Sequence, residues 1–385
     1  MTLAPVPRAL WLLIAAAALV RTLALVATTS ISCLFDECFY TDIASALARG
    51  EGFQPHARHY WPPGYVAFLA AHLKLGLGTL GAKASQVVLS TLLVPLTWGL
   101  ARRAARSWGE PHAGRVGLLA AALVAFNPTL VAYSHYLWSE TLFLPLFLGG
   151  LSLVLAAGES GSWRTAGLAG ICLGLACLIK VMPVYLVPVL AGWIYLCVPE
   201  GRRPVVPALA LVLATVAVIL PWSVRNTLTY DRFVLVETTT GKNLVRGNNP
   251  SGPANWDWGA HRNPRGVVAA AGCPQVDPIE LNDCATRAGI AAITGNPGRF
   301  VRDAATKVAD MVNPTSFLVR HVRRGIYGDW PAPLAHGLVV IVALFNVYLM
   351  GTGGVGWLNG PPGPVRTLTF LLVLYLLAIH TVTFG

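Results

Sequence analysis

Asp36 and Glu37 form an acidic pair directly after the first long apolar segment of the sequence. Carboxylates at a membrane boundary are costly unless they are solvated or used. A carboxylate within hydrogen-bond reach of a hydroxyl can accept its proton, as a general base does. We predict that Asp36 is such a base; the alternative is a solvated loop acid or a helix cap. Glu37 is predicted to orient the acceptor of the reaction or to pair with a basic residue.

Four basic residues near the same predicted boundary are candidates for binding a phosphate, which needs cationic or N–H partners. They are Lys180, Arg225, Arg58 and His59. Lys180 ends one apolar segment and Arg225 follows another. Long cationic side chains in such places also extend to the membrane interface without any ligand, so both interpretations stay open.

A further set of polar residues is predicted to position a substrate. Glu140 begins a later apolar segment. It is predicted to contact substrate or to pair with a cation such as Lys180. The alternative is that it interacts only with the helix dipole. Tyr40 lies in a short predicted helix after the acidic pair. Asn248 and Asn249 lie in a Gly-Asn-Asn-Pro sequence that is typical of turns.

Neither a metal site nor a cofactor is predicted. The acidic pair lacks the second alternating carboxylate of an Asp-x-Asp metal motif, and no His/Cys cluster has ligand spacing. Four of the seven cysteines lie outside the predicted spans, on the side where oxidation is allowed. The sequence leaves open whether Cys273–Cys284 and Cys33–Cys38 form disulfides, the second of which would brace the acidic motif, or whether all four are free thiols.

The composition places these residues in a membrane protein. Of the 385 residues, 55% are hydrophobic and 12% are charged, and the mean hydropathy is +0.60; a soluble domain carries about 25% charged residues. These values exclude a disordered chain, a fibrous repeat and an ordinary cytosolic enzyme. A bilayer span needs about 20 mostly apolar residues. Nine spans are predicted, over residues 9–28, 84–101, 116–133, 139–156, 165–180, 182–198, 205–223, 333–350 and 367–384.

Residues 64–80 are also apolar, but we predict an amphipathic helix on the outer membrane surface. If they crossed the membrane, the loop 102–115 with its four arginines would lie outside, whereas cytoplasmic loops are rich in Lys and Arg. His72 and Lys74 also lie in the middle of this stretch, where charge is expensive. Cytoplasmic arginine then explains the excess of 28 basic over 17 acidic residues, and no nucleic-acid partner is predicted.

The resulting topology predicts three parts. They are a membrane domain over 1–223 that includes an outer acidic loop 30–83, an outer cap over 224–332, and C-terminal transmembrane helices over 333–385. Within the cap, residues 233–238 alternate like a short strand, and helical patterns follow at 278–295 and 297–312. The predicted fold is therefore an all-α polytopic membrane protein with a small α/β outer cap.

Motifs along nearly the whole chain resemble one known family. The matching residues are Phe35-Asp36-Glu37, Tyr40, Ile43, Ala44, Gly50, Pro62-Pro63-Gly64-Tyr65, Asn127-Pro128, Tyr133-Ser134, Ser139-Glu140, Gly174-Leu175-Ala176, Lys180, Pro221-Trp222, Arg225-Asn226, Gly241, Asn243-Leu244, Gly247-Asn248-Asn249-Pro250 and Asn296-Pro297. Together they are similar to the protein O-mannosyltransferase-like family, glycosyltransferase family 39. Its relatives include bacterial lipid A aminoarabinose transferases and other lipid-linked sugar transferases.

This resemblance implies a GT-C fold with its active site at the outer face of the inner membrane. It also implies a polyprenyl-phosphate-linked sugar donor and transfer to an acceptor hydroxyl with inversion, Asp36 acting as the base. The acceptor is left open among protein, lipid and glycan. Two departures are that Lys180 stands where relatives often have Arg, and that the chain ends without the outer motif and further spans of similar proteins. It is then a fragment or a shortened member.

Two other classes of protein remain as alternatives. A lipid or sugar transporter, or a flippase, predicts ionisable residues in mid-span and inverted repeats; the sequence offers only Arg21 inside a span and no repeat. A non-catalytic envelope assembly protein with a GT-C-like fold is suggested by the short C-terminal part.

Overall fold

A computed structural model provides the structure of the protein. It describes residues 7–28, 33, 36–55, 59–248, 264–274, 277–314, 318–319, 322, 325 and 331–383. These residues form α-helices and connecting loops, without a β-strand in the described ranges. The helices are α1 (Arg8–Ala27), α2 (Asp36–Ala48), α3 (Pro63–Lys74), α4 (Gly78–Ser107), α5 (Ala113–Ala125), α6 (Pro128–His135), α7 (Glu140–Ser160), α8 (Trp163–Cys177), α9 (Pro183–Cys197), α10 (Val205–Tyr230), α11 (Thr240–Gly247), α12 (Pro264–Ala270), α13 (Pro278–Gly295), α14 (Pro297–Met311), α16 (Ala332–Asn359) and α17 (Pro364–Thr383).

The long apolar helices form one bundle, which confirms the all-α polytopic membrane class. Each predicted span lies in a helical segment, but the number nine is not supported. Six of the described helices are long and apolar enough to cross a membrane, namely α1, α4, α7, α10, α16 and α17. The bent pair α5 and α6 raises this number to seven at most. Helices α8 and α9 have 15 residues each, which is shorter than the about 20 that a bilayer core needs.

The break between α5 and α6 has a clear local cause. The two helices meet at 51°. Pro128 begins α6 at a position where its missing N–H costs nothing. The Asn127 side chain caps this new helix, because its Oδ1 accepts from the amides of Thr129 at 2.9 Å and Leu130 at 3.1 Å.

Arg21 supports the same break from the neighbouring helix α1. Its side chain is fully buried. Nη1 donates to the carbonyl of Ala125 at 2.8 Å, Nη2 to that of Val124 at 3.2 Å, and Nε to Ser90 Oγ at 2.8 Å. The last carbonyls of a helix have no partner within it, so the guanidinium satisfies the end of α5 inside the bundle.

The helices α8 and α10 pack at backbone contact. A Cβ on Gly170 would lie 2.4 Å from the Leu211 carbonyl oxygen, and one on Gly174 would lie 2.7 Å from Val218 Cβ. Small residues four apart allow such close approach between membrane helices. This contact belongs to the main apolar core, which also includes α7 and α9.

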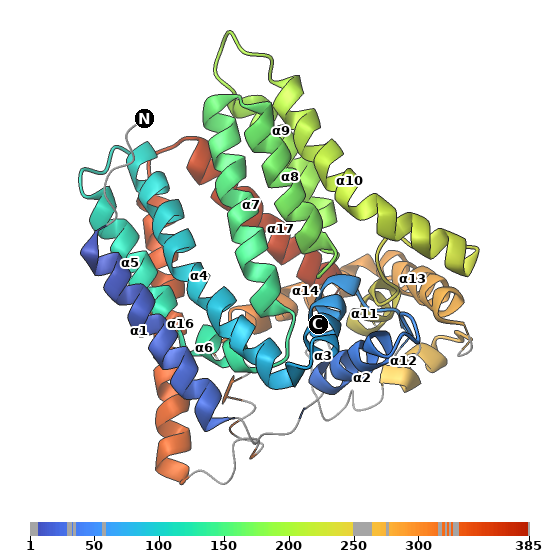
Figure 1. The fold of residues 1–385 in the computed structure, drawn as a ribbon. Coiled ribbons are helices and arrows are strands. Elements are labelled where there is room, and N and C mark those ends of the chain that lie inside the picture. The colour runs from blue at the N-terminus through green and yellow to red at the C-terminus, as the bar shows by residue number, and fades with distance from the viewer. Residues whose placement is uncertain are drawn as a thin grey trace.

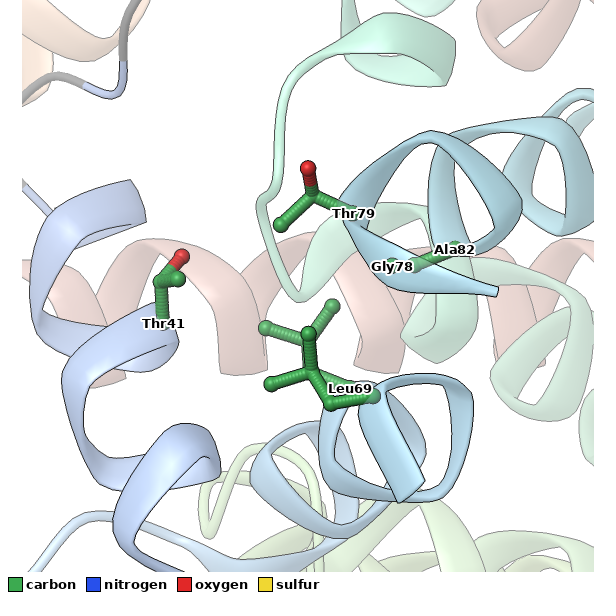
Figure 2. Close-up of a pocket in the computed structure, with 6 residues that line it drawn as sticks. Thr41, Leu69, Gly78, Thr79 and Ala82 are labelled. Atoms are coloured by element: carbon green, nitrogen blue, oxygen red, sulfur yellow. The ribbon is translucent and has the colours of Figure 1, made fainter. Parts of the chain in front are cut away.

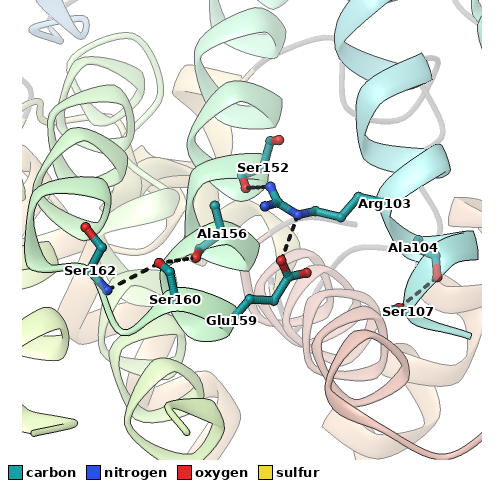
Figure 3. Close-up of polar contacts among 8 residues, drawn as sticks. All are labelled: Arg103, Ala104, Ser107, Ser152, Ala156, Glu159, Ser160 and Ser162. Atoms are coloured by element: carbon teal, nitrogen blue, oxygen red, sulfur yellow. Dashed lines mark hydrogen bonds and ion pairs between the residues drawn. The ribbon is translucent and has the colours of Figure 1, made fainter. Parts of the chain in front are cut away.

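Arginine-rich connections lie at one end of the bundle. In Figure 1 the α4–α5, α7–α8 and α9–α10 connections are at the upper end, whereas α2, α3, α11 and α12 are at the lower end. Figure 3 shows Arg103 joining α4 to α7, with Nε 3.1 Å from Glu159 Oε2 and Nη1 3.5 Å from the Ser152 carbonyl. Arg202 donates to the Ser160 carbonyl in the same region. The predicted separation of cytoplasmic arginines from the outer segments requires such an arrangement.

The apolar stretch 64–80 does not form a spanning helix. Helix α3 ends at Lys74 after 12 residues, which gives a length of about 18 Å, against about 30 Å of hydrocarbon. It packs on its neighbours through Tyr65 and Leu69, both buried. The next helix, α4, begins at Gly78, six residues earlier than the predicted span. The location of α3 on a membrane surface stays a prediction.

The described residues of the cap form helices and loops, and the predicted strand over 233–238 is wrong, because these residues are not in a strand. The alternation does bury Val234 and Val236, but the backbone carbonyls of this segment bond to side chains of α10 instead of to a second strand. Trp222 Nε1 donates to Val236 O at 3.0 Å, and Ser223 Oγ donates to Leu235 O at 2.6 Å. The alternation of apolar residues over 233–238 therefore reflects the burial of alternate side chains, not the pairing of this segment with a second strand.

The structure contains both disulfides that the sequence left open. Cys273–Cys284 joins the end of α12 to α13 within a small core that includes Val245 and Leu281. Cys33–Cys38 links the approach to α2 with its first turn. Cross-links of this kind stabilise segments with little core of their own.

Candidate active site

Helix α2 carries the acidic pair in its first turn. Acidic side chains are favourable at a helix N-terminus because of the helix dipole, so Asp36 and Glu37 suit this position. Tyr40, Ile43 and Ala44 are buried at helical spacing and attach α2 to the protein. Asp36, in contrast, is exposed.

Glu37 has a different environment from its neighbour. It is 6% exposed, and its Oε1 accepts from the Leu137 amide at 3.0 Å. This bond ties α2 to the connection between α6 and α7. The placement favours a positioning role, in which Glu37 holds the helix that presents Asp36.

Glu140 and Lys180 form an ion pair, one of the alternatives that the sequence offered for Glu140. Lys180 Nζ lies 3.0 Å from Glu140 Oε1, and both side chains are about one third exposed or less. Glu140 begins α7, and Lys180 follows the end of α8. The adjacent Ser139 accepts a hydrogen bond from Tyr40 at 3.4 Å, so α2 is linked to the start of α7.

Five charged groups act on one another around Asp36. Burial within the surrounding protein is the largest cause that raises the pKa of Asp36, and the negative Glu140 raises it further. The cations Lys180, Lys242 and Arg246 oppose this increase. Asp36 is therefore exposed to solvent and yet influenced by four charged side chains from other helices and loops.

Tyr40 lies among the acidic groups of this site. Burial raises its pKa, and the carboxylates of Glu140, Asp36 and Glu237 add to the effect. Its hydroxyl consequently stays protonated at neutral pH and donates to Ser139. Tyr40 thus lies between α2 and α7, where the sequence predicted a positioning residue.

Lys242 and Arg246 were missed by the sequence interpretation. They are four residues apart on α11, in a segment interpreted as cap turns. Burial lowers the pKa of Arg246 to about 10, and Asp36 acts in the opposite direction. The pattern that would have revealed them is an i, i+4 pair of cations on one face of a short helix.

Arg225 is not among the described charges that act on Asp36. Its guanidinium lies 5.0 Å from the Trp222 ring centroid and 5.2 Å from that of Tyr230. Nη1 also donates to the Tyr230 hydroxyl at 2.6 Å and to Asn226 Oδ1 at 3.1 Å. These contacts agree with a structural role at the end of α10, where the sequence predicted phosphate binding.

The remaining predicted residues lie in contacts between segments or outside the described part. His59 is buried, with Nδ1 3.1 Å from the Thr238 carbonyl. Asn248 Nδ2 donates to the carbonyls of Leu244 and Val382, both at 2.8 Å. Arg58 and Asn249 lie outside the described residues.

A small recess near α2 is distinct from the Asp36 group. Figure 2 shows it between α2, α3 and the start of α4, with Thr41, Leu69 and Thr79 facing its interior. No charged side chain lines it, and it has no room for a water molecule. It offers no site for a sugar. The described residues also contain no metal-binding group of three or more His, Cys, Asp or Glu; metal independence itself stays a prediction.

Comparison with known families identifies the central part of the chain. Residues 61–224 match the model of the dolichyl-phosphate-mannose-protein mannosyltransferase family. This region is similar to that family. The resemblance predicted from the sequence is thereby confirmed, and it supports a membrane glycosyltransferase that uses a lipid-linked sugar. No curated protein and no solved structure showed a significant match.

The mannosyltransferase match includes Glu140 and Lys180. It begins at Trp61, after Asp36, and ends at Val224, before α11. The two segments that complete the charged group therefore lie outside the matched region, and their placement beside Lys180 comes from the tertiary structure.

Proposed function

We propose that the protein transfers a sugar from a polyprenyl-phosphate carrier to an acceptor hydroxyl at the outer face of the inner membrane. The observation that carries the proposal is the charged group around the solvent-open Asp36, at the end of the bundle opposite the arginine-rich connections. The family match supports the lipid-linked donor and the membrane setting.

In this mechanism Asp36 accepts the proton of the acceptor hydroxyl. The hydroxyl oxygen attacks the anomeric carbon, and the bond from that carbon to the phosphate oxygen breaks. The polyprenyl phosphate leaves with the electron pair, so no strong acid is needed. A single displacement inverts the anomeric centre. Lys180 stabilises the negative charge of the leaving phosphate, and Glu140 holds Lys180 in place.

The raised pKa of Asp36 fits this role. A carboxyl with a higher pKa is a stronger base, and burial together with Glu140 provides the increase. The nearby cations Lys180, Lys242 and Arg246 act against this increase and favour the ionised form.

The test is a transfer assay on the purified protein in lipid nanodiscs. Polyprenyl-phosphate-linked sugars are offered with hydroxyl-bearing peptides, glycans and lipids, and both the glycosylated product and the released polyprenyl phosphate are measured. We expect transfer with inverted anomeric configuration, unchanged by a chelator. Asp36→Asn should be inactive, whereas Asp42→Asn, on the exposed side of the same helix, should be active.

Three outcomes would contradict the proposal. Full transfer by Asp36→Asn would remove Asp36 as the base. Movement of the lipid across the bilayer without sugar transfer would favour a flippase. Binding of the donor with no turnover in any combination would favour an assembly protein.

A further inference from the structure

The disulfide Cys33–Cys38 closes a short loop that contains the acidic pair. Cys33 precedes α2 and Cys38 is the third residue of this helix, with a distance of 5.2 Å between their Cα atoms. Asp36 and Glu37 lie between the two cysteines in the sequence. The candidate base is therefore a member of a small covalent ring.

Contacts that do not involve the disulfide hold α2 from Glu37 onward. The Glu37 carboxylate accepts from the Leu137 amide at 3.0 Å, and Tyr40 is buried. Asp36 is one residue nearer the helix end, and its side chain is exposed. The first amides of a helix have no partner within the helix, so this end unwinds easily unless it is held from outside. The bond to Cys33 supplies that restraint.

The two disulfides differ in their access to solvent. Cys273 is 4% exposed and belongs to the small core of the cap, against which Cys284 packs. Cys33 is exposed, and Cys38 is partly exposed. Reduction requires a thiolate to reach one of the two sulfurs, and exposed disulfides are the labile ones, which include those with regulatory roles. A dithiol outside the membrane therefore reaches Cys33–Cys38, while the Cys273–Cys284 bond is shielded.

We propose that the Cys33–Cys38 disulfide is a redox switch for sugar transfer at Asp36. The inference rests on the proposed function and adds a means of regulating it. In the oxidised state the covalent ring fixes the first turn of α2, and Asp36 with it. In the reduced state this turn loses its restraint, whereas the rest of α2 stays anchored. A general base must lie within hydrogen-bond reach of the acceptor, and a small misplacement costs much of the rate, so reduction lowers turnover.

The reductant is a dithiol, and the exchange transfers two electrons. One thiolate of the dithiol attacks Cys33 Sγ, the S–S bond breaks, and Cys38 leaves as a thiolate with the bonding pair. The second thiol of the reductant attacks the mixed disulfide, which releases Cys33 and closes a disulfide within the reductant. The two released thiolates take up the two protons that the dithiol gives up. Oxidation of the two cysteines reverses the switch.

The experiment titrates the protein in nanodiscs with mixtures of reduced and oxidised dithiothreitol. At each ratio, alkylation with mass spectrometry gives the reduced fraction of each disulfide, and the transfer assay gives kcat. We expect kcat to fall about tenfold or more as Cys33–Cys38 is reduced, and to recover on reoxidation. The double variant Cys33→Ala with Cys38→Ala should be slow from the start and insensitive to dithiothreitol. The double variant Cys273→Ala with Cys284→Ala is the matched control and should respond as the wild type does.

Hydrogen–deuterium exchange measures the structural part of the switch without using activity. The amides of residues 40–42 bond in the helix to the carbonyls of residues 36–38, so their exchange should become faster when Cys33–Cys38 is reduced. The amides of residues 45–48, at the other end of the same helix, should be unaffected. This difference separates release of the first turn from unfolding of α2 as a whole.

Unchanged kcat in protein whose Cys33–Cys38 bond is fully reduced would overturn the inference and leave the proposed function intact. A fall in kcat that follows reduction of Cys273–Cys284 would overturn it as well. If the oxidised protein transfers no sugar, the proposed function is refuted, and the exchange of residues 40–42 then decides on the redox element alone. Thermal unfolding of each variant is recorded. If a double variant does not fold, the dithiothreitol titration of the wild type, resolved by mass spectrometry, provides the result.

Discussion

Two groups of polar side chains lie in this apolar bundle, and they are organised differently. Around Arg21, each donor nitrogen bonds to a carbonyl or hydroxyl of the protein. Around Asp36, charged side chains act on one another, and the central carboxylate is open to solvent. We call the Arg21 group closed, because its donors are bonded within the protein, and the Asp36 group open, because its central carboxylate is exposed to solvent.

The difference shows how a buried charge can be assigned a role. A guanidinium that donates to the last carbonyls of a helix at a break replaces the missing helical partners, so Arg21 stabilises the path of the chain. Charged side chains that act on an exposed carboxylate can respond to an added ligand, because their interactions are with one another and with solvent. This contrast also weakens the transporter alternative, since Arg21 is saturated by the protein.

The largest effect is expected from Asp36→Asn, which should lower transfer activity without lowering stability, unlike a change in the Arg21 group. Loss of a general base lowers turnover by about 10²–10⁴-fold, while the midpoint of thermal unfolding should stay within error because Asp36 makes no closed network. Turnover and unfolding are measured on the same preparation. A loss of stability without a loss of turnover would reverse the roles given to the two groups.

Arg21→Leu should give the opposite result. It leaves the carbonyls of Val124 and Ala125 without a donor, which costs about 1–3 kcal/mol for a buried acceptor. We expect a lower free energy of unfolding and nearly unchanged turnover per folded molecule. Chemical unfolding in detergent measures the former, with Arg8→Leu, at the exposed start of α1, as the control. Equal stability of the two variants would show that the Arg21 network is dispensable.

Lys180→Met should reduce activity more than stability. The KM for the donor should rise about tenfold through loss of a charge-assisted hydrogen bond. Its partly exposed ion pair with Glu140 contributes only about 0.2–1 kcal/mol to folding. A double-mutant cycle with Glu140→Gln measures this coupling. A coupling energy of several kcal/mol would show that the Glu140–Lys180 pair mainly stabilises the fold, as the Arg21 group does.

The smallest effect concerns the pH dependence of kcat/KM. The base must be ionised, and its pKa is raised, so activity should fall with decreasing pH at a higher pH than an ordinary Asp near 3.9 would give. Glu140→Gln removes a negative neighbour and should move this acid limb to lower pH. Lys242→Met removes a positive neighbour and should move it to higher pH. Shifts in the same direction would contradict the proposed arrangement.

Much of the site followed from residue type and place in the sequence. Asp36 stands beside an apolar segment where an unused carboxylate is costly, and the cysteine positions offered the Cys33–Cys38 and Cys273–Cys284 pairings without deciding whether they form. The same reasoning was wrong for 233–238, because alternation specifies which side chains are buried and not what bonds to the backbone. It named Arg225 as a phosphate ligand because it follows a span; in the folded protein its guanidinium lies over Trp222 and Tyr230, and phosphate binding stays a prediction.

The sequence by itself determined a helical membrane protein with its arginines apart from its acidic motif, because apolar length and charge distribution are local properties that the bilayer selects directly. Only the tertiary structure decided which charges meet. Lys180 and Lys242 are 62 positions apart along the chain, yet both act on Asp36, and α11, which carries Lys242, is packed on α13 by glycine contacts and tied to α17 by a side-chain bond. No local pattern encodes contacts between such distant segments, so the cations around Asp36 became visible only in the folded chain.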